Sequence, residues 1–104
     1  MSCSVTYDNS NDWGSGFIAN VTIANDGTAA ISGWTLAFTF PGDQQITNLW
    51  SGGFTQNGAE VLVDNVDYNS TINPGSSVSF GFQASYSGSN DNPTTFVLNG
   101  ESCN

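Results

Sequence analysis

The ionisable side chains of this 104-residue sequence limit the chemistry that it can perform. It contains nine acidic residues and no Lys, Arg or His, and its formal net charge is −9. Without histidine or lysine, nucleophilic triads and most metal sites cannot be assembled. A small Ca²⁺ site built from Asp and Asn oxygens stays open, although no ligand spacing typical of calcium loops is present. We expect no metal and no cofactor.

One acid pair could in principle hydrolyse a glycoside. Asp64 and Asp67 lie three residues apart in the stretch VDNVDYN. A glycosidase needs one carboxyl group whose pKa is raised by an apolar environment. No such environment is visible around this pair, so we interpret both residues as solvated loop acids and expect no catalytic residue.

Three aromatic side chains stand among residues that favour turns. Trp13 lies in NDWGS, Trp50 is followed by SGG, and Tyr68 lies in VDYNST. Asn, Asp, Gly and Ser favour turns because they tolerate unusual backbone angles or hydrogen-bond their own main chain. None of the three rings belongs to a hydrophobic period that would bury it. Three exposed rings on a chain of this length predict a binding surface.

Sugars fit a surface of exposed rings and neutral polar groups. The C–H face of a pyranose lies flat on an indole, and its hydroxyl groups reach amides at the rim. The candidate amides are Asn11, Asn20, Asn48 and Gln83. Single-stranded nucleic acid and anionic membranes both require basic residues, which the chain lacks, so we expect neither as a partner. A proline-rich peptide stays open as an alternative ligand.

Strands are the elements that must position these residues. Period-two alternation bounded by turn residues is typical of half-buried strands. It predicts strands at residues 16–24, 33–40 and 78–84, with shorter ones at 3–7, 45–50, 61–63 and 95–99. Turn signals occur at residues 25–27, 41–43, 56–58 and 73–75, and no segment has a helical period. The pattern predicts an all-β fold, an antiparallel two-sheet β-sandwich of the immunoglobulin or jelly-roll kind, with residues 1–104 as one domain.

The same alternation assigns side chains to faces. Trp34 falls on the apolar face of its strand, so we expect it in the core. Ile46, Asn48 and Trp50 fall on one side of theirs, where the asparagine indicates a solvent-exposed face. Asn20 is expected to project outward.

The two cysteines lie at opposite ends of the chain. Paired cysteines in a small polar domain usually form a disulfide, so Cys3 and Cys103 are predicted to join the termini. A disulfide implies an oxidising compartment and hence export. No signal peptide or membrane-spanning run is visible, so we interpret the sequence as a piece of a longer secreted protein.

The whole chain, from Cys3 to Cys103, resembles the family 2 carbohydrate-binding modules of bacterial cellulases, xylanases and chitinases. The resemblance is carried by NDWGSGFIANVTIAN, ISGWTLAFTFPGDQQITNLWSG, INPGSSVSFGFQASYSG and PTTFVLNGESC, in that order. It implies a sandwich with a terminal disulfide, a buried Trp34, and platform rings at Trp13 and Trp50. Tyr68 stands where the third platform ring is usually tryptophan.

The resemblance also implies a function. It indicates a secreted bacterial module, expected to be monomeric, that binds crystalline cellulose without catalysis and targets a covalently linked catalytic domain. The presence of residues 59–72 and the absence of arginine favour the cellulose-binding type over the xylan-binding type. Chitin binding is the close alternative. A structural or adhesive domain that binds protein is the alternative from another class, and a small glycosidase is a more distant one.

Overall fold

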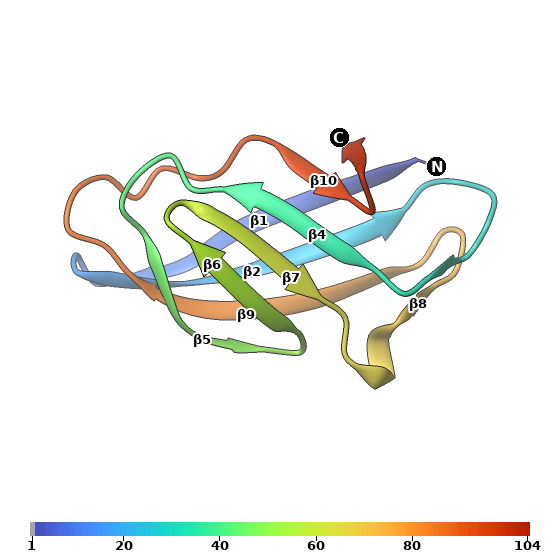
Figure 1. Cartoon of the computed structure of the whole chain (residues 1–104), viewed down its shortest axis with the longest axis horizontal. Helices are drawn as coiled ribbons and strands as arrows, with labels where there is room; N and C mark the ends of the chain where they lie inside the picture. The colour runs from blue at the N-terminus through green and yellow to red at the C-terminus, as the bar shows by residue number, and fades with distance from the viewer. Residues whose placement is uncertain (1) are drawn as a thin grey trace.

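The computed structural model describes residues 2–104 and contains two packed layers of β-structure (Figure 1). In chain order the elements are β1 (Cys3–Asp12), β2 (Gly16–Asn25), β3 (Ile31–Ser32), β4 (Thr35–Thr39), β5 (Gln45–Trp50), β6 (Gly53–Asn57), β7 (Glu60–Asp64), the 3₁₀ turn η1 (Asp67–Asn69), β8 (Thr71–Ile72), β9 (Ser77–Ser85), β10 (Phe96–Leu98) and β11 (Glu101–Cys103).

The strands form two main sheets and one short pair. One sheet has the order β1-β2-β9-β5, and the other has the order β11-β10-β4-β7-β6. The two-residue strands β3 and β8 pair separately. Each pairing between neighbouring strands of residues 2–104 is antiparallel. The predicted antiparallel β-sandwich is confirmed.

Alternate residues of both sheets meet in an aromatic core. Phe82 of β9 lies at its centre, with ring centroids 5.8 Å from Phe17 and 5.9 Å from Phe40. Trp34 is 2% exposed and stacks on Phe80 of the facing sheet, 6.0 Å between centroids. The core position expected for Trp34 is confirmed. Because aromatic rings bury large areas, these contacts supply much of the attraction between the sheets.

Several strand boundaries differ from those expected. Strand β1 continues past residue 7 to Asp12, because a bulge at Ser10 lets the chain keep pairing with β2. Strand β6 was not predicted, since the polar sequence GFTQN has little hydrophobic alternation and lies at a sheet edge. The short strands β3, β8 and β11 were also missed. Edge pairings of two or three residues depend on tertiary contacts more than on local pattern.

The chain contains one short helical turn that the sequence pattern does not predict. The 3₁₀ turn η1 spans Asp67–Asn69 and joins β7 to β8. A single 3₁₀ turn has no apolar stripe for a sequence pattern to reveal. No helix within residues 2–104 is long and apolar enough to span a membrane.

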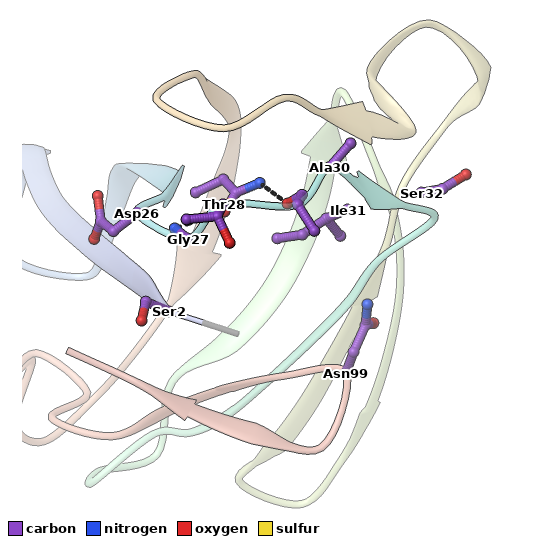
Figure 2. A pocket seen from close by; sticks show the side chains of 10 residues that line it. Ser2, Asp26, Gly27, Thr28, Ala30, Ile31, Ser32 and Asn99 are labelled. Atoms are coloured by element: carbon purple, nitrogen blue, oxygen red, sulfur yellow. Dashed lines mark hydrogen bonds between the residues drawn. The ribbon is translucent and has the colours of Figure 1, made fainter.

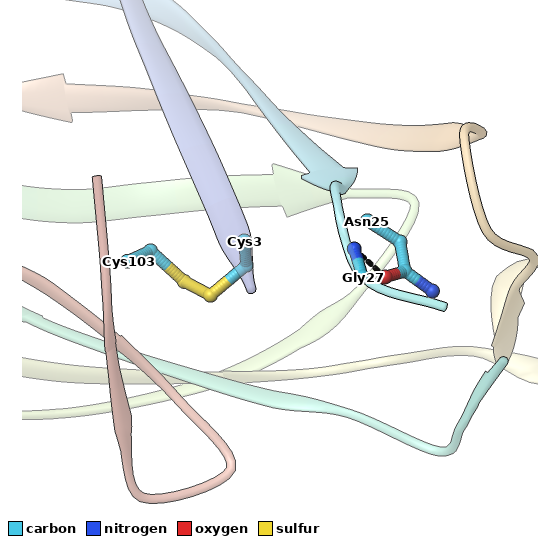
Figure 3. The surroundings of a disulfide bond; sticks show 4 residues. All are labelled: Cys3, Asn25, Gly27 and Cys103. Atoms are coloured by element: carbon cyan, nitrogen blue, oxygen red, sulfur yellow. Dashed lines mark hydrogen bonds between the residues drawn. A yellow bond between two sulfur atoms is a disulfide. The ribbon is translucent and has the colours of Figure 1, made fainter. Parts of the chain in front are cut away.

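The termini are joined by the predicted disulfide, which the structure confirms (Figure 3). Cys3 and Cys103 are bonded, with their Cα atoms 4.8 Å apart. Backbone hydrogen bonds run beside the bridge, from Val5 N to Asn104 O at 2.8 Å and from Asn104 N to Cys3 O at 2.9 Å. The end of the chain therefore pairs with the start of β1, although β1 and β11 belong to different sheets.

We predict that the disulfide contributes strongly to stability. It closes a loop with a sequence separation of 100 residues. The chain-entropy model assigns such a loop about 4–5 kcal/mol of unfolding free energy. Urea unfolding of the oxidised protein and of the Cys3→Ser/Cys103→Ser variant should therefore give clearly separated midpoints. Coincident midpoints would show that the bridge adds nothing to the terminal hydrogen bonds.

We predict that Trp34→Ala lowers the unfolding free energy by about 3–5 kcal/mol, as expected for truncation of a buried aromatic side chain. The substitution also removes the hydrogen bond from Trp34 Nε1 to Asn69 O, at 2.8 Å. Trp34→Phe keeps a ring and should cost less. Chemical denaturation measures both effects, and an unchanged midpoint for Trp34→Ala would contradict the core assignment.

Candidate binding face

The outer face of the sheet β1-β2-β9-β5 brings the four predicted amides together. Asn11, Ile18, Gln83 and Asn48 are register partners across the four strands. Two residues beyond Ile18 on β2, Asn20 pairs with Asp8 of β1 and with Gly81 of β9. The amide side chains of Asn11, Asn20, Asn48 and Gln83 are all exposed. The sequence pattern predicts these residues on strands or turns, and the register puts them on one surface.

Trp13 packs closely against the backbone of a glycine at one end of this face. It belongs to the β1–β2 hairpin, where Trp13 N donates to Gly16 O at 3.0 Å. A Cβ atom at Gly16 would lie 2.7 Å from Cζ2 and 2.9 Å from Cε2 and Nε1 of the indole. These three atoms follow one another along one edge of the indole, so the ring lies against the glycine where a side chain would otherwise stand. Trp13 is 48% exposed, so the glycine side of the ring is covered in part and the rest is open to solvent.

Trp50 repeats this arrangement on β9. It pairs with Gly81, and a Cβ atom there would lie 2.6 Å from both Cε2 and Cζ2 of the indole. Because Phe80 and Phe82 point into the core, the open side of Gly81 faces outward, beneath the ring. Trp50 is 40% exposed. The supporting role of both glycines was not predicted from the sequence, although glycine inside a strand often marks close approach of another group.

The two indoles lie well apart on the sheet. Gly16 supports Trp13, and Asn20, four residues further along β2, pairs with Gly81 beneath Trp50. At ~3.3 Å per residue the supporting positions are about 13 Å apart along the strand. The Ile18–Gln83 pair lies midway between them. A ligand that contacts both rings must therefore be longer than one sugar ring and pass over the amide row.

Two β-bulges turn the outer-strand residues toward this face. Ser10 of β1 and Thr47 of β5 are the extra residues. Their hydroxyl groups donate to the carbonyl oxygens of Ile18 and Gln83, at 3.2 and 3.1 Å. The two bulges therefore lie on the two edge strands of the sheet, and each contacts one member of the central Ile18–Gln83 pair.

The bulge in β5 overturns one expectation. Period-two alternation predicts Ile46 on the same side as Asn48 and Trp50, but Ile46 is buried while the other two are exposed. A bulge inserts one residue and so reverses the alternation beyond it. Ile46 pairs with the inward Ala84, and Trp50 pairs with Gly81, which faces outward.

Tyr68 lies on η1, next to the turn that follows Trp50. It is 77% exposed, and its hydroxyl donates to Ser51 Oγ at 2.8 Å. The neighbouring Asn69 is only 8% exposed, and its Nδ2 donates to Ser51 O at 2.7 Å. The side chain of Asn69 is therefore turned inward, away from the surface that carries the Tyr68 ring.

Asp12 holds the hairpin that carries Trp13. Its carboxylate accepts hydrogen bonds from Tyr86 Oη at 2.6 Å, from Asn90 Nδ2 at 2.9 Å and from Gly14 N at 2.9 Å. These bonds, the one from Tyr86 first, hold the pKa of Asp12 below its ordinary value. The same contact raises the pKa of Tyr86. The carboxylate thus stays ionised in mildly acidic solution, where it keeps its three donors.

The structure gives the acid pair no catalytic setting. Asp64 Oδ1 accepts a hydrogen bond from Thr35 Oγ1 at 2.7 Å, and both Asp64 and Asp67 are exposed. Exposed carboxyl groups lack the apolar surroundings that a glycosidase acid needs. Among residues 2–104, no group of three His, Cys, Asp or Glu side chains could hold a metal ion.

A pocket of about 560 Å³ lies away from the indoles, near the start of the chain (Figure 2). It is formed by the segment between β2 and β3 with contributions from Ser2 and Asn99. None of its lining residues is aromatic, which makes it a poor site for sugar stacking. The exposed rings and amides therefore mark the sheet face, and not this hollow, as the candidate binding site.

Comparison with known proteins gives the family of the chain. The chain matches the family described as "Cellulose binding domain" over residues 3–103. It is 46% identical over 102 residues to exoglucanase B of Cellulomonas fimi, covering 98% of this chain and 9% of that protein. It is 44% identical to exoglucanase A of the same organism, covering 97% and 12%. It is 40% identical to chitinase C of Streptomyces lividans, covering 98% and 16%. The chain thus spans only a small part of each of these relatives.

Solved structures share the fold. The chitin-binding domain of Chi18aC from Streptomyces coelicolor aligns with a TM-score of 0.78 and 40% identity, covering 98% of this chain and 94% of that one. The cellulose-binding family 2 domain of ScLPMO10C aligns with a TM-score of 0.71 and 34% identity, covering 89% of each chain. The resemblance seen in the sequence is confirmed: the chain belongs to the cellulose binding domain family, the non-catalytic family 2 carbohydrate-binding modules.

Proposed function

We propose that the outer face of the sheet β1-β2-β9-β5 binds crystalline cellulose through a planar platform formed by Trp13, Trp50 and Tyr68. The observation that carries this proposal is the position of the two indoles. Each lies against a glycine of one sheet face and stays about half exposed to solvent. A flat array of glucose rings in a crystal can stack on such rings without the module changing shape.

The amides between the rings complete the proposed contact. Asn11, Asn20, Asn48 and Gln83 are exposed on the face that carries the indoles. Amide groups can donate to and accept from sugar hydroxyls, whereas the apolar C–H faces contact the rings. The chain has no cationic side chain and cellulose is uncharged, so binding should depend little on salt.

We propose that residues 1–104 act as one monomeric, secreted module linked to a catalytic domain. The small share of each relative that the chain covers supports this arrangement, since exoglucanases A and B of Cellulomonas fimi are far longer. The disulfide supports an extracellular location, because such bonds persist in oxidising compartments. The module would hold its enzyme at the polysaccharide surface.

Chitin is the second candidate ligand. Its support is the 40% identity both to chitinase C of Streptomyces lividans and to the chitin-binding domain of Chi18aC. Chitin presents the same type of pyranose C–H face, and its acetamido groups could also meet the amide row. Parallel adsorption to microcrystalline cellulose, chitin and xylan at low and high salt separates the candidates. Preferential retention on cellulose, with weak salt dependence, supports the first.

We predict that Trp13→Ala and Trp50→Ala each weaken adsorption to cellulose at least about tenfold, as truncation of an interface anchor does. The melting temperature should change little, because both rings lie on the surface. Leu62→Ala is the matched control: this side chain is 47% exposed but lies on the five-stranded sheet. Equal binding by the two tryptophan variants and the wild type would contradict the proposed face.

We predict that a glycan on Asn20 weakens cellulose binding. Asn20 lies in the acceptor sequence NVT, is exposed, and pairs with Gly81 beneath Trp50. Thr71→Ala removes the second acceptor sequence, at Asn69, and leaves Asn20 as the acceptor site. After secretion from a eukaryotic host, this variant should bind less than Thr22→Ala/Thr71→Ala, which has neither site. Equal binding by the two, with the glycan verified by mass spectrometry, would remove Asn20 from the contact face.

A further inference from the structure

Ser51 occupies an unusual backbone position directly after Trp50. Its φ angle is +64°, in the left-handed region that residues with a side chain rarely adopt. The next residue, Gly52, is packed so closely that a Cβ atom would lie 3.1 Å from Asp64 O and Val63 Cγ1. These two residues form the short link from β5 in one sheet to β6 in the other. A strained non-glycine residue beside a candidate site suggests that its side chain has a role.

The main chain of Ser51 is tied to η1. Its carbonyl oxygen accepts a hydrogen bond from Asn69 Nδ2 at 2.7 Å, and Asn69 Oδ1 accepts one from Val66 N at 2.9 Å. The carbonyl of Asn69 accepts the hydrogen bond from the core residue Trp34, at 2.8 Å. This chain of contacts fixes the backbone of η1 against both the core and the turn after Trp50.

The side chain of Ser51 makes a separate contact. Tyr68 Oη donates to Ser51 Oγ at 2.8 Å. Tyr68 is 77% exposed, so neighbouring atoms cover little of its ring. An exposed side chain normally samples several rotamers, whereas a phenol held at both Cα and Oη cannot swing. The contact therefore restricts the ring without burying it.

We propose that the Ser51 hydroxyl is a positioning group that holds the ring of Tyr68 in the binding platform next to Trp50. Ser51 directly follows Trp50 in the chain, and its hydroxyl accepts a hydrogen bond from Tyr68. This one residue therefore determines how the rings of Trp50 and Tyr68 are placed relative to each other. Ordering the phenol before binding removes part of the conformational entropy that binding would otherwise cost. This inference rests on the proposed cellulose-binding face and adds a residue that does not itself contact the sugar.

The test compares cellulose adsorption by Tyr68→Phe, Ser51→Gly and the double variant. Ser51→Gly removes the hydroxyl and suits the left-handed backbone, so it should fold. Each single variant should lose about fivefold in affinity, the usual effect of one hydrogen bond. The double variant should lose no more than the weaker-binding single variant, because all three lack the same bond. Tyr68→Ala, which lacks the ring, should bind more weakly than Tyr68→Phe.

Two controls separate positioning from general stability. Tyr7→Phe also removes a phenol hydroxyl, but Tyr7 Oη is buried and has no hydrogen-bond partner among residues 2–104, so cellulose binding by this variant should be unchanged. Ser76→Gly places the same serine substitution in an exposed turn outside the outer face of the sheet.

NMR relaxation of the Tyr68 ring supplies the second readout: ring order should fall in Ser51→Gly even where the melting temperature is kept.

The outcomes distinguish this inference from the proposed function. If Trp50→Ala weakens binding while Tyr68→Phe and Ser51→Gly bind as the wild type does, the positioning role is wrong and the platform stands. If Trp50→Ala has no effect, the platform itself is wrong. Independent, additive losses in the double variant, or unchanged ring order in Ser51→Gly, would also overturn the positioning role.

Discussion

The binding face depends on the packing of indole rings against glycine backbone. An indole on a protein surface would ordinarily fold onto the nearest apolar side chains and lose its exposed face. At Gly16 and Gly81 the absence of a Cβ atom lets Trp13 and Trp50 lie directly on a strand. The strand covers part of each ring, and the rest stays open to solvent. The cost of exposing part of an aromatic ring is tolerated because the covered part still packs.

A rigid sheet is needed for that packing to have a fixed geometry. The aromatic core around Phe82 holds the two sheets together, and the Cys3–Cys103 disulfide ties the ends of the chain. The bulges at Ser10 and Thr47 then decide which side chains reach the surface, since each reverses the alternation of an outer strand. Without the bulge in β5, Trp50 would share the inward side with Ile46. The position of the ring therefore follows from one extra residue in the strand.

Much of this arrangement could be predicted from the sequence because alternation and turn residues are local signals. The sandwich and the buried Trp34 follow from them, and the exposed setting of Trp13 follows from its polar neighbours. The disulfide follows from the presence of two cysteines in a small polar domain. The bulges could not be predicted, since Ser10 and Thr47 resemble ordinary strand residues and the register depends on the partner strand. For the same reason the face predicted for Ile46 was wrong. The inward turn of Asn69 was also out of reach, because its partner Ser51 is brought to it by the fold.

The most direct measurement of the central claim is an NMR titration of the labelled protein with cellohexaose. The account predicts that the indole Nε1–H signals of Trp13 and Trp50 shift together with the side-chain amides of Asn48 and Gln83, while the buried indole of Trp34 stays unchanged. Shifts confined to the opposite sheet, around Leu62 and Val97, with both exposed indoles unaffected, would contradict it.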